Sequence, residues 1–311
     1  EVKRRLSQYG LNSIIEEQTI SALKIFINQF KSFLVILLIL AAGVSLFLSF
    51  QEKIAMEITY IDSNTIELET NFLALTEALK KAFEKNTVEV PMRHHHDFPN
   101  PEVGEDSTLL LMPAWNPSKD AGVKIVTVSP ENSKFDLPSI QGTYVYLDAA
   151  KGSIKALLEA KNLTAKRTAA ASALASSFLS RKDASSLLMI GTGTLSINLI
   201  KAHTSVRPIK QVYVWGRTLE KALNICEQLA GENYTVTPVG RISDAIDKVD
   251  IVSCATLSKT PLVLGKQLKK GQHIDLVGAY KTDMREADNC AIIKSNVFVD
   301  TYQGGLKESG E

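Results

Sequence analysis

A glycine pair after an apolar run is the feature of this sequence best suited to chemistry. Residues 187–190 are apolar and are followed by Gly191-Thr192-Gly193-Thr194-Leu195-Ser196, then by a helical pattern and a β-rich run from Gln211. This order is typical of a βαβ nucleotide-binding unit. Gly191 permits a tight turn, and Gly193 lets the backbone approach a pyrophosphate at the start of the helix. We expect residues 191–195 to bind a dinucleotide; a purely structural turn is the alternative.

The end of the second strand indicates which dinucleotide binds. An NAD site usually has Asp or Glu there, whereas this strand ends at Trp215-Gly216-Arg217-Thr218. The guanidinium of Arg217 suits a 2′-phosphate, and Thr218 adds a further donor. The alternative is that Arg217 is only a solvated residue at a helix start. We therefore expect NADPH rather than NADH.

Three cations, Arg93, Lys124 and Arg167, occupy positions where an anion could bind. Arg93 lies in a polar loop, Lys124 interrupts the apolar strand 123–128, and Arg167 lies near the predicted start of helix 163–180. A lysine inside a strand is costly unless it is paired or faces water, so an exposed edge strand is one interpretation of Lys124. An arginine at a helix start opposes the helix dipole, which favours an anion beside Arg167.

Other chemistry is disfavoured by the composition. The 311-residue chain is 45% hydrophobic with a net charge of +1, and its basic residues are spread out, so we expect no nucleic-acid partner. The three cysteines are widely spaced and predict reduced thiols. His94, His95 and His96 alternate faces in an extended chain, and we expect no metal site there.

The elements that must position these residues follow from periodicity. From residue 56 the pattern alternates between strands and helices, which predicts an α/β protein with a parallel, doubly wound sheet in its second half. The predicted strands are 58–62, 107–112, 122–129, 142–148, 187–190, 211–215, 234–239, 250–254, 273–277 and 296–300, and the predicted helices are 71–84, 163–180, 197–203, 218–229 and 242–248. Residues 88–97 are expected to form a polar loop.

The first 55 residues differ from the rest. A charged, helix-prone stretch leads into residues 32–50, which are 19 residues without a charge and are long enough to cross a bilayer. A buried core helix is the alternative. This region resembles the start of P-type cation-transporting ATPases, through residues 1–12 and 23–35. The Asp-Lys-Thr-Gly-Thr phosphorylation motif of that family does not occur, so we expect no pump activity from this fragment.

The remainder resembles the ornithine cyclodeaminase and mu-crystallin family over residues 56–311. The segments that carry the resemblance are Val90–Arg93, Leu110–Ala114, Gly122–Val126, Ser129–Asn132, Leu163–Ala170 and Gly191–Gly193. The resemblance implies a substrate and dimerisation domain beside a Rossmann domain. It also implies a nicotinamide cofactor, a small amino-acid or imino-acid substrate, and a homodimer. The cytoplasmic location that we expect for this part of the chain follows from the reduced cysteines.

The same resemblance assigns roles to individual residues. It implies that Arg93, Lys124 and Arg167 surround the substrate carboxylate, which gives the strand lysine a reason to exist. The further positions that it implies for the cofactor are Ser139, Thr168, Ala255, Thr256, Val277 and Gly278.

One branch of the family fits best. Cyclodeaminases have an Asp where this chain has Tyr280, and residues 94–96, 215–218, 284–288 and 297–301 look like bacterial reductases of cyclic ketimine carboxylates. We therefore expect NADPH-dependent reduction of Δ1-pyrroline-2-carboxylate or Δ1-piperideine-2-carboxylate to proline or pipecolate. Ornithine cyclodeamination and a non-catalytic, mu-crystallin-like binding role are the alternatives.

The expected organisation has four parts. Residues 1–55 form the ATPase-like fragment, whose apolar span 32–50 would contact a membrane; 56–166 form the substrate domain; and 167–301 form the NADP-binding domain. The family continues beyond the point where this chain stops, so residues 302–311 are expected to begin a return to the substrate domain.

Overall fold

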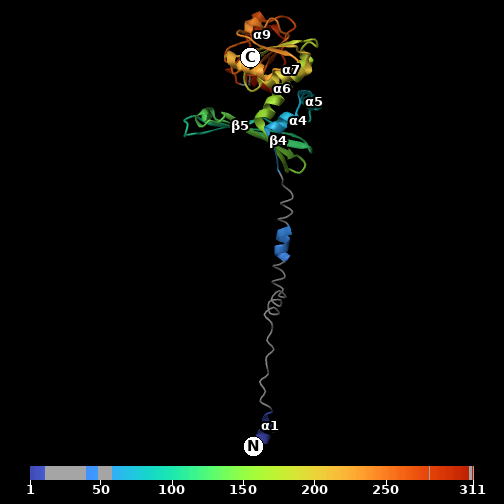
Figure 1. Ribbon diagram of the computed structural model, residues 1–311, viewed down its shortest axis with the longest axis vertical. Helices are drawn as coiled ribbons and strands as arrows, with labels where there is room; N and C mark the ends of the chain where they lie inside the picture. The colour runs from blue at the N-terminus through green and yellow to red at the C-terminus, as the bar shows by residue number, and fades with distance from the viewer. Residues whose placement is uncertain (11–39, 48–57, 280, 308–309, 311) are drawn as a thin grey trace. The chain divides into compact units, whose positions relative to one another are not determined.

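The structure is a computed structural model that describes residues 1–10, 40–47, 58–279, 281–307 and 310. The chain divides into two compact units, residues 1–57 and 58–311, and each is described here by itself (Figure 1). All elements that carry predicted site residues belong to the second unit.

The described part of the first unit is helical. Helix α1 spans Val2–Tyr9, and residues 40–47 form a second helical segment. The rest of the expected apolar span 32–50 lies outside the described residues. Within the described residues, no helix is both long and apolar enough to cross a membrane.

A six-stranded sheet occupies the first half of the second unit. Its strands lie in the order β1-β6-β5-β4-β3-β2, with β1 parallel to β6 and all other neighbours antiparallel. The strands are β1 Thr59–Ile61, β2 His94–Phe98, β3 Ser107–Asn116, β4 Asp120–Val128, β5 Ile140–Asp148 and β6 Ile154–Glu159. A 3₁₀ helix, η1 Pro130–Phe135, links β4 to β5.

Strand β4 lies between β3 and β5, so the edge-strand interpretation of Lys124 is wrong. In the register, Lys124 lies opposite Met112 on β3 and Tyr144 on β5. Residues opposite one another in an antiparallel pair point to the same face of the sheet. The lysine therefore shares one face with Tyr144, and its side chain is half-buried.

Three helices accompany this sheet. Helices α4 Ser63–Glu69 and α5 Phe72–Lys85 begin at Asp62 and Asn71, whose side chains accept hydrogen bonds from Thr65 N and Ala74 N. Such caps satisfy amides that the helix itself leaves unpaired.

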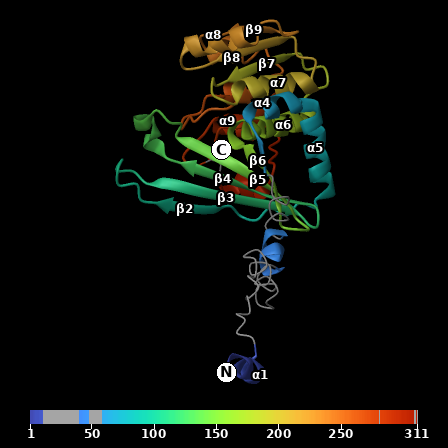
Figure 2. The same cartoon turned by 60° about the horizontal axis from the view of Figure 1, so that its bottom comes forward.

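Helix α6 spans Ala160–Leu179 and lies beside the first sheet (Figure 2). It contacts β5 of that sheet and β11 of the second sheet. The Glu159 carboxylate caps it by accepting from Lys161 N and Asn162 N. Arg167 therefore lies two turns inside the helix, and the expectation that it lies near the start is wrong. The carboxylate cap at Glu159, four residues before Leu163, extends the helix.

The second sheet has five parallel strands in the order β11-β10-β7-β8-β9. They are β7 Ser186–Ile190, β8 Gln211–Trp215, β9 Thr235–Pro238, β10 Ile251–Cys254 and β11 His273–Leu276. Helices α7 Ser196–Val206 and α8 Leu219–Gln228 follow β7 and β8. The order reverses direction between β7 and β10, which is where ligands bind in sheets of this kind.

Two apolar clusters enclose the parallel sheet. One joins α6, α7 and α8 to it and includes Ala169, Ala173, Leu187 and Leu199; the other includes Leu188, Ile246 and Val252. Small residues on α6 let α7 approach closely, and the strands, covered on both faces, are nearly continuous runs of apolar residues.

Three sequence-based assignments of structure are wrong. Strand β2 overlaps the expected loop 88–97 at residues 94–97, and it was missed because all five of its residues are exposed and show no apolar alternation. Residues 242–248 contain only the 3₁₀ helix η2 Ile242–Asp244, followed by turns. Ser243 and Asp244 favour local hydrogen bonds over a longer helix.

The expected strand 296–300 is also absent from this described segment. Val297, Phe298 and Val299 are exposed, and β11 remains the edge of its sheet. Without a neighbouring strand, an apolar β-prone sequence has no ladder to join. The remaining elements here are η3 Gly265–Gln267, α9 Asn289–Lys294 and α10 Tyr302–Lys307.

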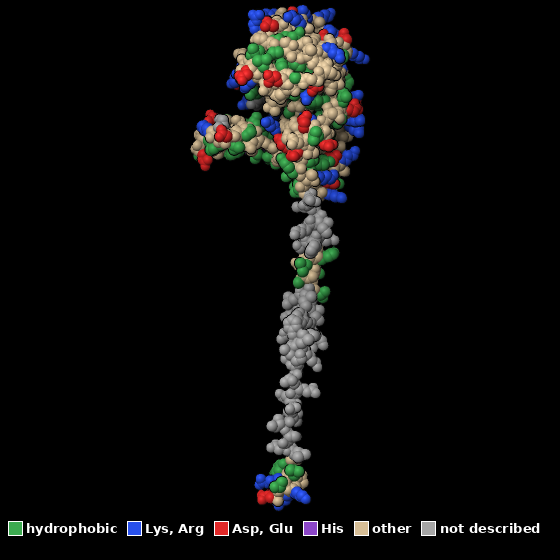
Figure 3. All heavy atoms as spheres, in the orientation of Figure 1, with side chains coloured by type: hydrophobic (Ala, Val, Ile, Leu, Met, Phe, Trp, Pro, Cys, Tyr) green, Lys and Arg blue, Asp and Glu red, His purple; other side chains and the backbone are tan. Residues whose placement is uncertain are grey.

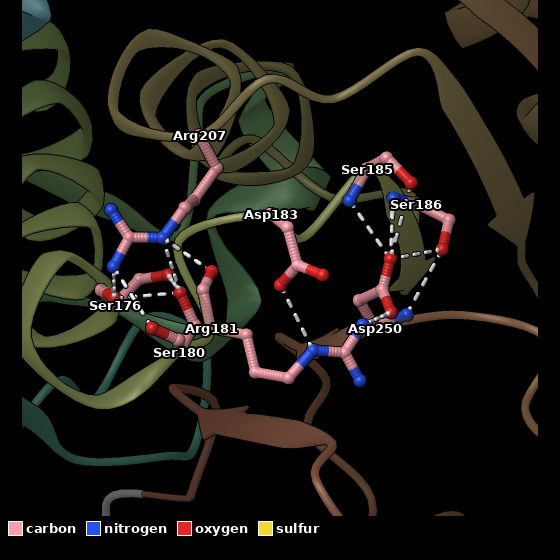
Figure 4. Close-up of polar contacts among 8 residues, drawn as sticks. All are labelled: Ser176, Ser180, Arg181, Asp183, Ser185, Ser186, Arg207 and Asp250. Atoms are coloured by element: carbon pink, nitrogen blue, oxygen red, sulfur yellow. Dashed lines mark hydrogen bonds and ion pairs between the residues drawn. The ribbon is translucent and has the colours of Figure 1, made fainter.

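A polar network fastens the amino ends of the parallel strands, opposite the glycine turn (Figure 4). Asp250, before β10, accepts from Ser185 N and Ser186 N and pairs with Arg181 at 2.5 Å. Arg207 donates to the carbonyls of Ser176 and Ser180 at the end of α6. These contacts fix α6 against the sheet on which the glycine turn is built.

Charges of both signs are interspersed over the face of the second unit drawn in Figure 3. Hydrophobic side chains also gather along the arm that projects to the left in this view.

Candidate dinucleotide and carboxylate site

The glycine turn leaves β7 at the point where the sheet order reverses. Gly191 has a φ of 119°, and a Cβ on it would lie 2.5 Å from the Ala255 carbonyl oxygen. Gly193, in contrast, has open space where a Cβ would be. The first glycine therefore meets the loop after β10, and the second presents bare backbone outward.

The start of α7 is suited to an anion. Its N-cap is Leu195, which makes no side-chain capping hydrogen bond. The Ser196 hydroxyl, which is buried, instead donates to the Gly191 carbonyl at 2.9 Å and ties the turn to the helix. Uncapped amides at a helix N-terminus attract phosphate groups. The exposed residues of this turn are Gly193 and Thr194.

Arg217 and Thr218 lie at the end of β8, beside this turn. A Cβ on Gly216 would meet the Thr192 side chain at 2.5 Å, so the two segments touch. Arg217 is exposed and makes no hydrogen bond or ion pair with another residue in the described part of the chain. Its guanidinium is thus available for an anionic ligand.

Lys124, Arg93 and Arg167 interact electrostatically. Burial, together with the charges of Arg167 and Arg93, lowers the pKa of Lys124 to about 8. Like charges drawn together in a partly desolvated place favour an anion between them. The three predicted cations therefore form one cluster, built from α6, β4 and the residue before β2.

Arg167 is exposed on α6, although neighbouring parts of the protein partly desolvate its guanidinium. Burial lowers the pKa of its guanidinium, while the carboxylate of Asp300 acts in the opposite direction. Sequence reasoning did not single out Asp300 for this position, because it is distant in the chain from Arg167 and belonged to an expected strand. Its spacing from Arg167 carries no sequence signal.

Tyr144 is a second neighbour that was missed. Its hydroxyl lies 2.2 Å from the place where a Cβ on Gly122 would be, so the phenol rests on that glycine two residues before Lys124. Burial and the Asp120 charge raise the pKa of this tyrosine. The alternation of β4 against β5 would have revealed the pairing only once the register was known.

The loops after β10 and β11 meet over one buried carboxylate. Thr256 N and Oγ1 donate to Glu286 Oε1, and Val277 N and Gly278 N donate to Oε2. Ala255, Thr256, Val277 and Gly278 are thus brought together, with the glycine turn against Ala255. Sequence reasoning used Glu286 only as part of a family motif.

The remaining predicted site residues are less connected. The Ser139 hydroxyl donates to the Pro130 carbonyl at 3.3 Å within its own loop, and Thr168 is half-buried on α6 next to Arg167. Tyr280 lies outside the described residues. No group of three or more metal-ligating side chains occurs in the described ranges, and the three adjacent histidines are exposed on β2.

Together these features define a class: an α/β protein with a dinucleotide-type turn at the switch point of a parallel sheet, beside a second sheet that carries a cationic cluster. The sequence model of the ornithine cyclodeaminase/mu-crystallin family matches residues 58–311, and this chain belongs to that family. A second family model, the N-terminus of cation transporters and ATPases, matches residues 1–45.

Three similar proteins illustrate the relationship. A Δ1-pyrroline-2-carboxylate reductase of Colwellia psychrerythraea is 35% identical, with 81% of this chain and 80% of the relative covered. The ketimine reductase mu-crystallin of Rattus norvegicus is 31% identical over 71% of this chain and 67% of the relative. The solved Δ1-pyrroline-2-carboxylate reductase of Thermococcus litoralis, in complex with NADH and L-proline, has a TM-score of 0.74 and 29% identity, with 81% and 79% covered.

Proposed function

We propose that this chain reduces a cyclic ketimine carboxylate, Δ1-pyrroline-2-carboxylate or Δ1-piperideine-2-carboxylate, to proline or pipecolate. The observation that carries the proposal is the cluster of Arg93, Lys124 and Arg167, which suits a small carboxylate. The names of its relatives, reductases of such imines, support the same substrate class.

The site residues fit a nicotinamide dinucleotide. Gly193 leaves its backbone open, no side chain caps the start of α7, and Arg217 is free to meet a phosphate. When bound, the reduced nicotinamide supplies the hydride that the C=N carbon accepts. The residues assigned to holding it are Ser139, Thr168, Gly191, Thr192, Gly193, Thr194, Leu195, Arg217, Thr218, Ala255, Thr256, Val277 and Gly278.

The cationic cluster orients the substrate. Arg93, Lys124 and Arg167 hold the carboxylate, and fixing that group also fixes the adjacent imine carbon, so much of the rate comes from positioning. Because the pKa of Lys124 is about 8, its Nζ carries a proton at neutral pH and the cluster is fully cationic there. A cationic surround also excludes amines that lack the carboxylate.

The preferred cofactor in this proposal is NADPH. Arg217 follows β8, where an acid would accept hydrogen bonds from an NAD ribose, and a guanidinium instead suits a 2′-phosphate. Thr218, exposed beside it, offers a hydroxyl donor. The solved relative with NADH shows that the fold also accepts the other nicotinamide cofactor.

The proposed assembly is a homodimer. Large apolar side chains are exposed on the arm between β4 and β5, with Phe135 52%, Leu137 50% and Ile140 60% accessible. Surface of this kind is typical of a protein interface.

The apolar composition of residues 32–50 suggests membrane contact for the first unit, to be tested by flotation of the full chain with lipid vesicles.

The reaction is tested with the purified full chain. NADPH oxidation is followed with each imine, and ammonia release is measured in parallel with ornithine and NAD. Loss of NADPH with formation of proline or pipecolate supports the proposal. Ammonia release from ornithine without imine reduction would replace it with cyclodeamination, and binding without turnover of either substrate would favour the binding role.

A further inference from the structure

We infer that Glu286 is a positioning residue, which holds the loops after β10 and β11 together so that they accept the nicotinamide half of the cofactor. The inference rests on the dinucleotide binding proposed above. Glu286 is fully buried, and it comes from a segment that follows both loops in the chain.

The Glu286 carboxylate bridges the two loops through four hydrogen bonds. Oε1 accepts from Thr256 N at 2.7 Å and Thr256 Oγ1 at 2.8 Å, while Oε2 accepts from Val277 N at 3.1 Å and Gly278 N at 2.7 Å. Each oxygen therefore serves a different loop. A buried carboxylate is costly unless it is hydrogen-bonded in this manner, because desolvation disfavours its charge.

The loops approach too closely to be held by side-chain packing. A Cβ on Gly278 would lie 2.0 Å from the Thr256 carbonyl oxygen and 2.7 Å from Glu286 Oε1. Only backbone and the carboxylate fit between the two loops. The carboxylate therefore sets the spacing of the loops together with close backbone contacts, which include the hydrogen bond from Val277 N to the Cys254 carbonyl at 2.9 Å.

The backbone around Glu286 fixes the carboxylate in turn. The backbone carbonyl of Glu286 accepts from Leu262 N at 2.8 Å and from Val263 N at 2.9 Å. The preceding amide, Arg285 N, donates to the Ser258 carbonyl at 2.9 Å. Thus the loop after β10 is anchored at both of its ends to the segment that carries the glutamate. The carboxylate has a rigid base from which to order the two loops.

The order of the strands indicates which half of the cofactor these loops meet. Arg217 follows β8 on one side of β7, whereas the loops follow β10 and β11 on the other side. A dinucleotide with its pyrophosphate at residues 191–193 and its 2′-phosphate at Arg217 extends its nicotinamide half over β10 and β11. Errors in loop position therefore affect the nicotinamide half and spare the adenosine half.

The test compares two ligands on the full chain with Glu286→Gln. A glutamine keeps the shape, but its NH₂ group faces N–H donors, so one loop loses its acceptor. Calorimetric titration is expected to show the Kd of NADPH raised about tenfold or more. The Kd of adenosine 2′,5′-bisphosphate, which ends before these loops, is expected to stay within about twofold.

Glu227→Gln is the matched control, because Glu227 is exposed on α8 and undergoes the same chemical change. It is expected to leave both Kd values unchanged. An unchanged Kd of NADPH in Glu286→Gln, or an equal rise for both ligands, would overturn the positioning role. If Glu286→Gln does not fold, the two Kd values are measured for Thr256→Val, which removes one donor to the carboxylate, and the same outcomes apply.

The two proposals fail in different ways. A wild-type chain that binds neither ligand overturns the proposed dinucleotide site and this inference with it. A wild-type chain that binds NADPH, together with a Glu286→Gln variant that binds it equally well, overturns only the role of Glu286.

Discussion

At the residue scale, the proposed carboxylate site depends on where the charge of Lys124 is placed. A central strand has no solvent-facing edge, and the neighbouring Arg93 and Arg167 add repulsion. The cost of this arrangement is removed when an anion binds among the three cations. Binding of an anionic ligand would therefore explain why a lysine occupies this position in the strand.

The pKa of Lys124 predicts a pH dependence. In the free enzyme the ammonium is retained below a pKa of about 8 and lost above it, so kcat/KM for the imine carboxylate should fall as pH rises through that value. Lys124→Arg keeps its charge and should lack this decline. The comparison of the two pH profiles, at saturating NADPH, cancels any titration of the substrate. Identical profiles would contradict the assignment.

Replacing Lys124 by Met removes the charge altogether. We expect kcat/KM at neutral pH to fall by about 10–100-fold, as is usual for the loss of a charged hydrogen bond, with turnover lowered as well as affinity. Steady-state kinetics separate the two effects. An unchanged kcat at saturating imine would restrict Lys124 to binding.

Arg217 predicts a cofactor-specific effect. Arg217→Ala should raise KM for NADPH by about tenfold or more, because an Arg–phosphate pair is lost. KM for NADH, which lacks the 2′-phosphate, should change little and is the internal control. An equal effect on both cofactors would show that Arg217 does not discriminate between them.

At the element scale, the second sheet contains a buried polar group that predicts acid sensitivity. Burial, with the charges of His203 and Arg207, lowers the pKa of His273 on β11 to about 4, although the Asp275 charge acts in the opposite direction. Since the unfolded chain binds the proton at about 6.5, stability is lost as pH falls from 6.5 towards 4. The loss attributable to this group is at most about 3 kcal/mol.

Urea unfolding followed by circular dichroism at pH 7.5 and pH 5 tests this effect. His273→Leu should lose less stability between the two pH values than the wild type does. His94→Leu, which changes an exposed histidine on β2, should behave as the wild type. Equal losses in all three proteins would assign the acid sensitivity to other groups.

Much of the parallel sheet was predictable because its strands are buried on both faces and are therefore continuous apolar runs. Strand β2 was not, since its residues are all exposed, and the true start of α6 depended on a carboxylate cap before the expected boundary. The glycine turn and the cationic residues were identifiable from type and spacing. Glu286 and Asp300 were not, because their contacts are long-range and carry no local pattern.

At the scale of the whole molecule, the exposed apolar arm predicts self-association. The double variant Phe135→Asp/Leu137→Asp should shift sedimentation from dimer towards monomer, because burying two carboxylates in an apolar interface is unfavourable. Leu68→Asp, on an exposed position of α4, is the control and should remain dimeric. A wild-type monomer, or a variant that remains dimeric, would contradict this interface.

The central claim is hydride transfer to the imine carbon of a substrate held by its carboxylate. It is tested most directly by incubating the full chain with NADPH deuterated at C4 of the nicotinamide and Δ1-pyrroline-2-carboxylate, followed by mass spectrometry and NMR of the product. We predict proline that carries the deuterium at C2, the former C=N carbon. Proline without deuterium when each C4 face is labelled in turn, or no proline at all, would contradict the account.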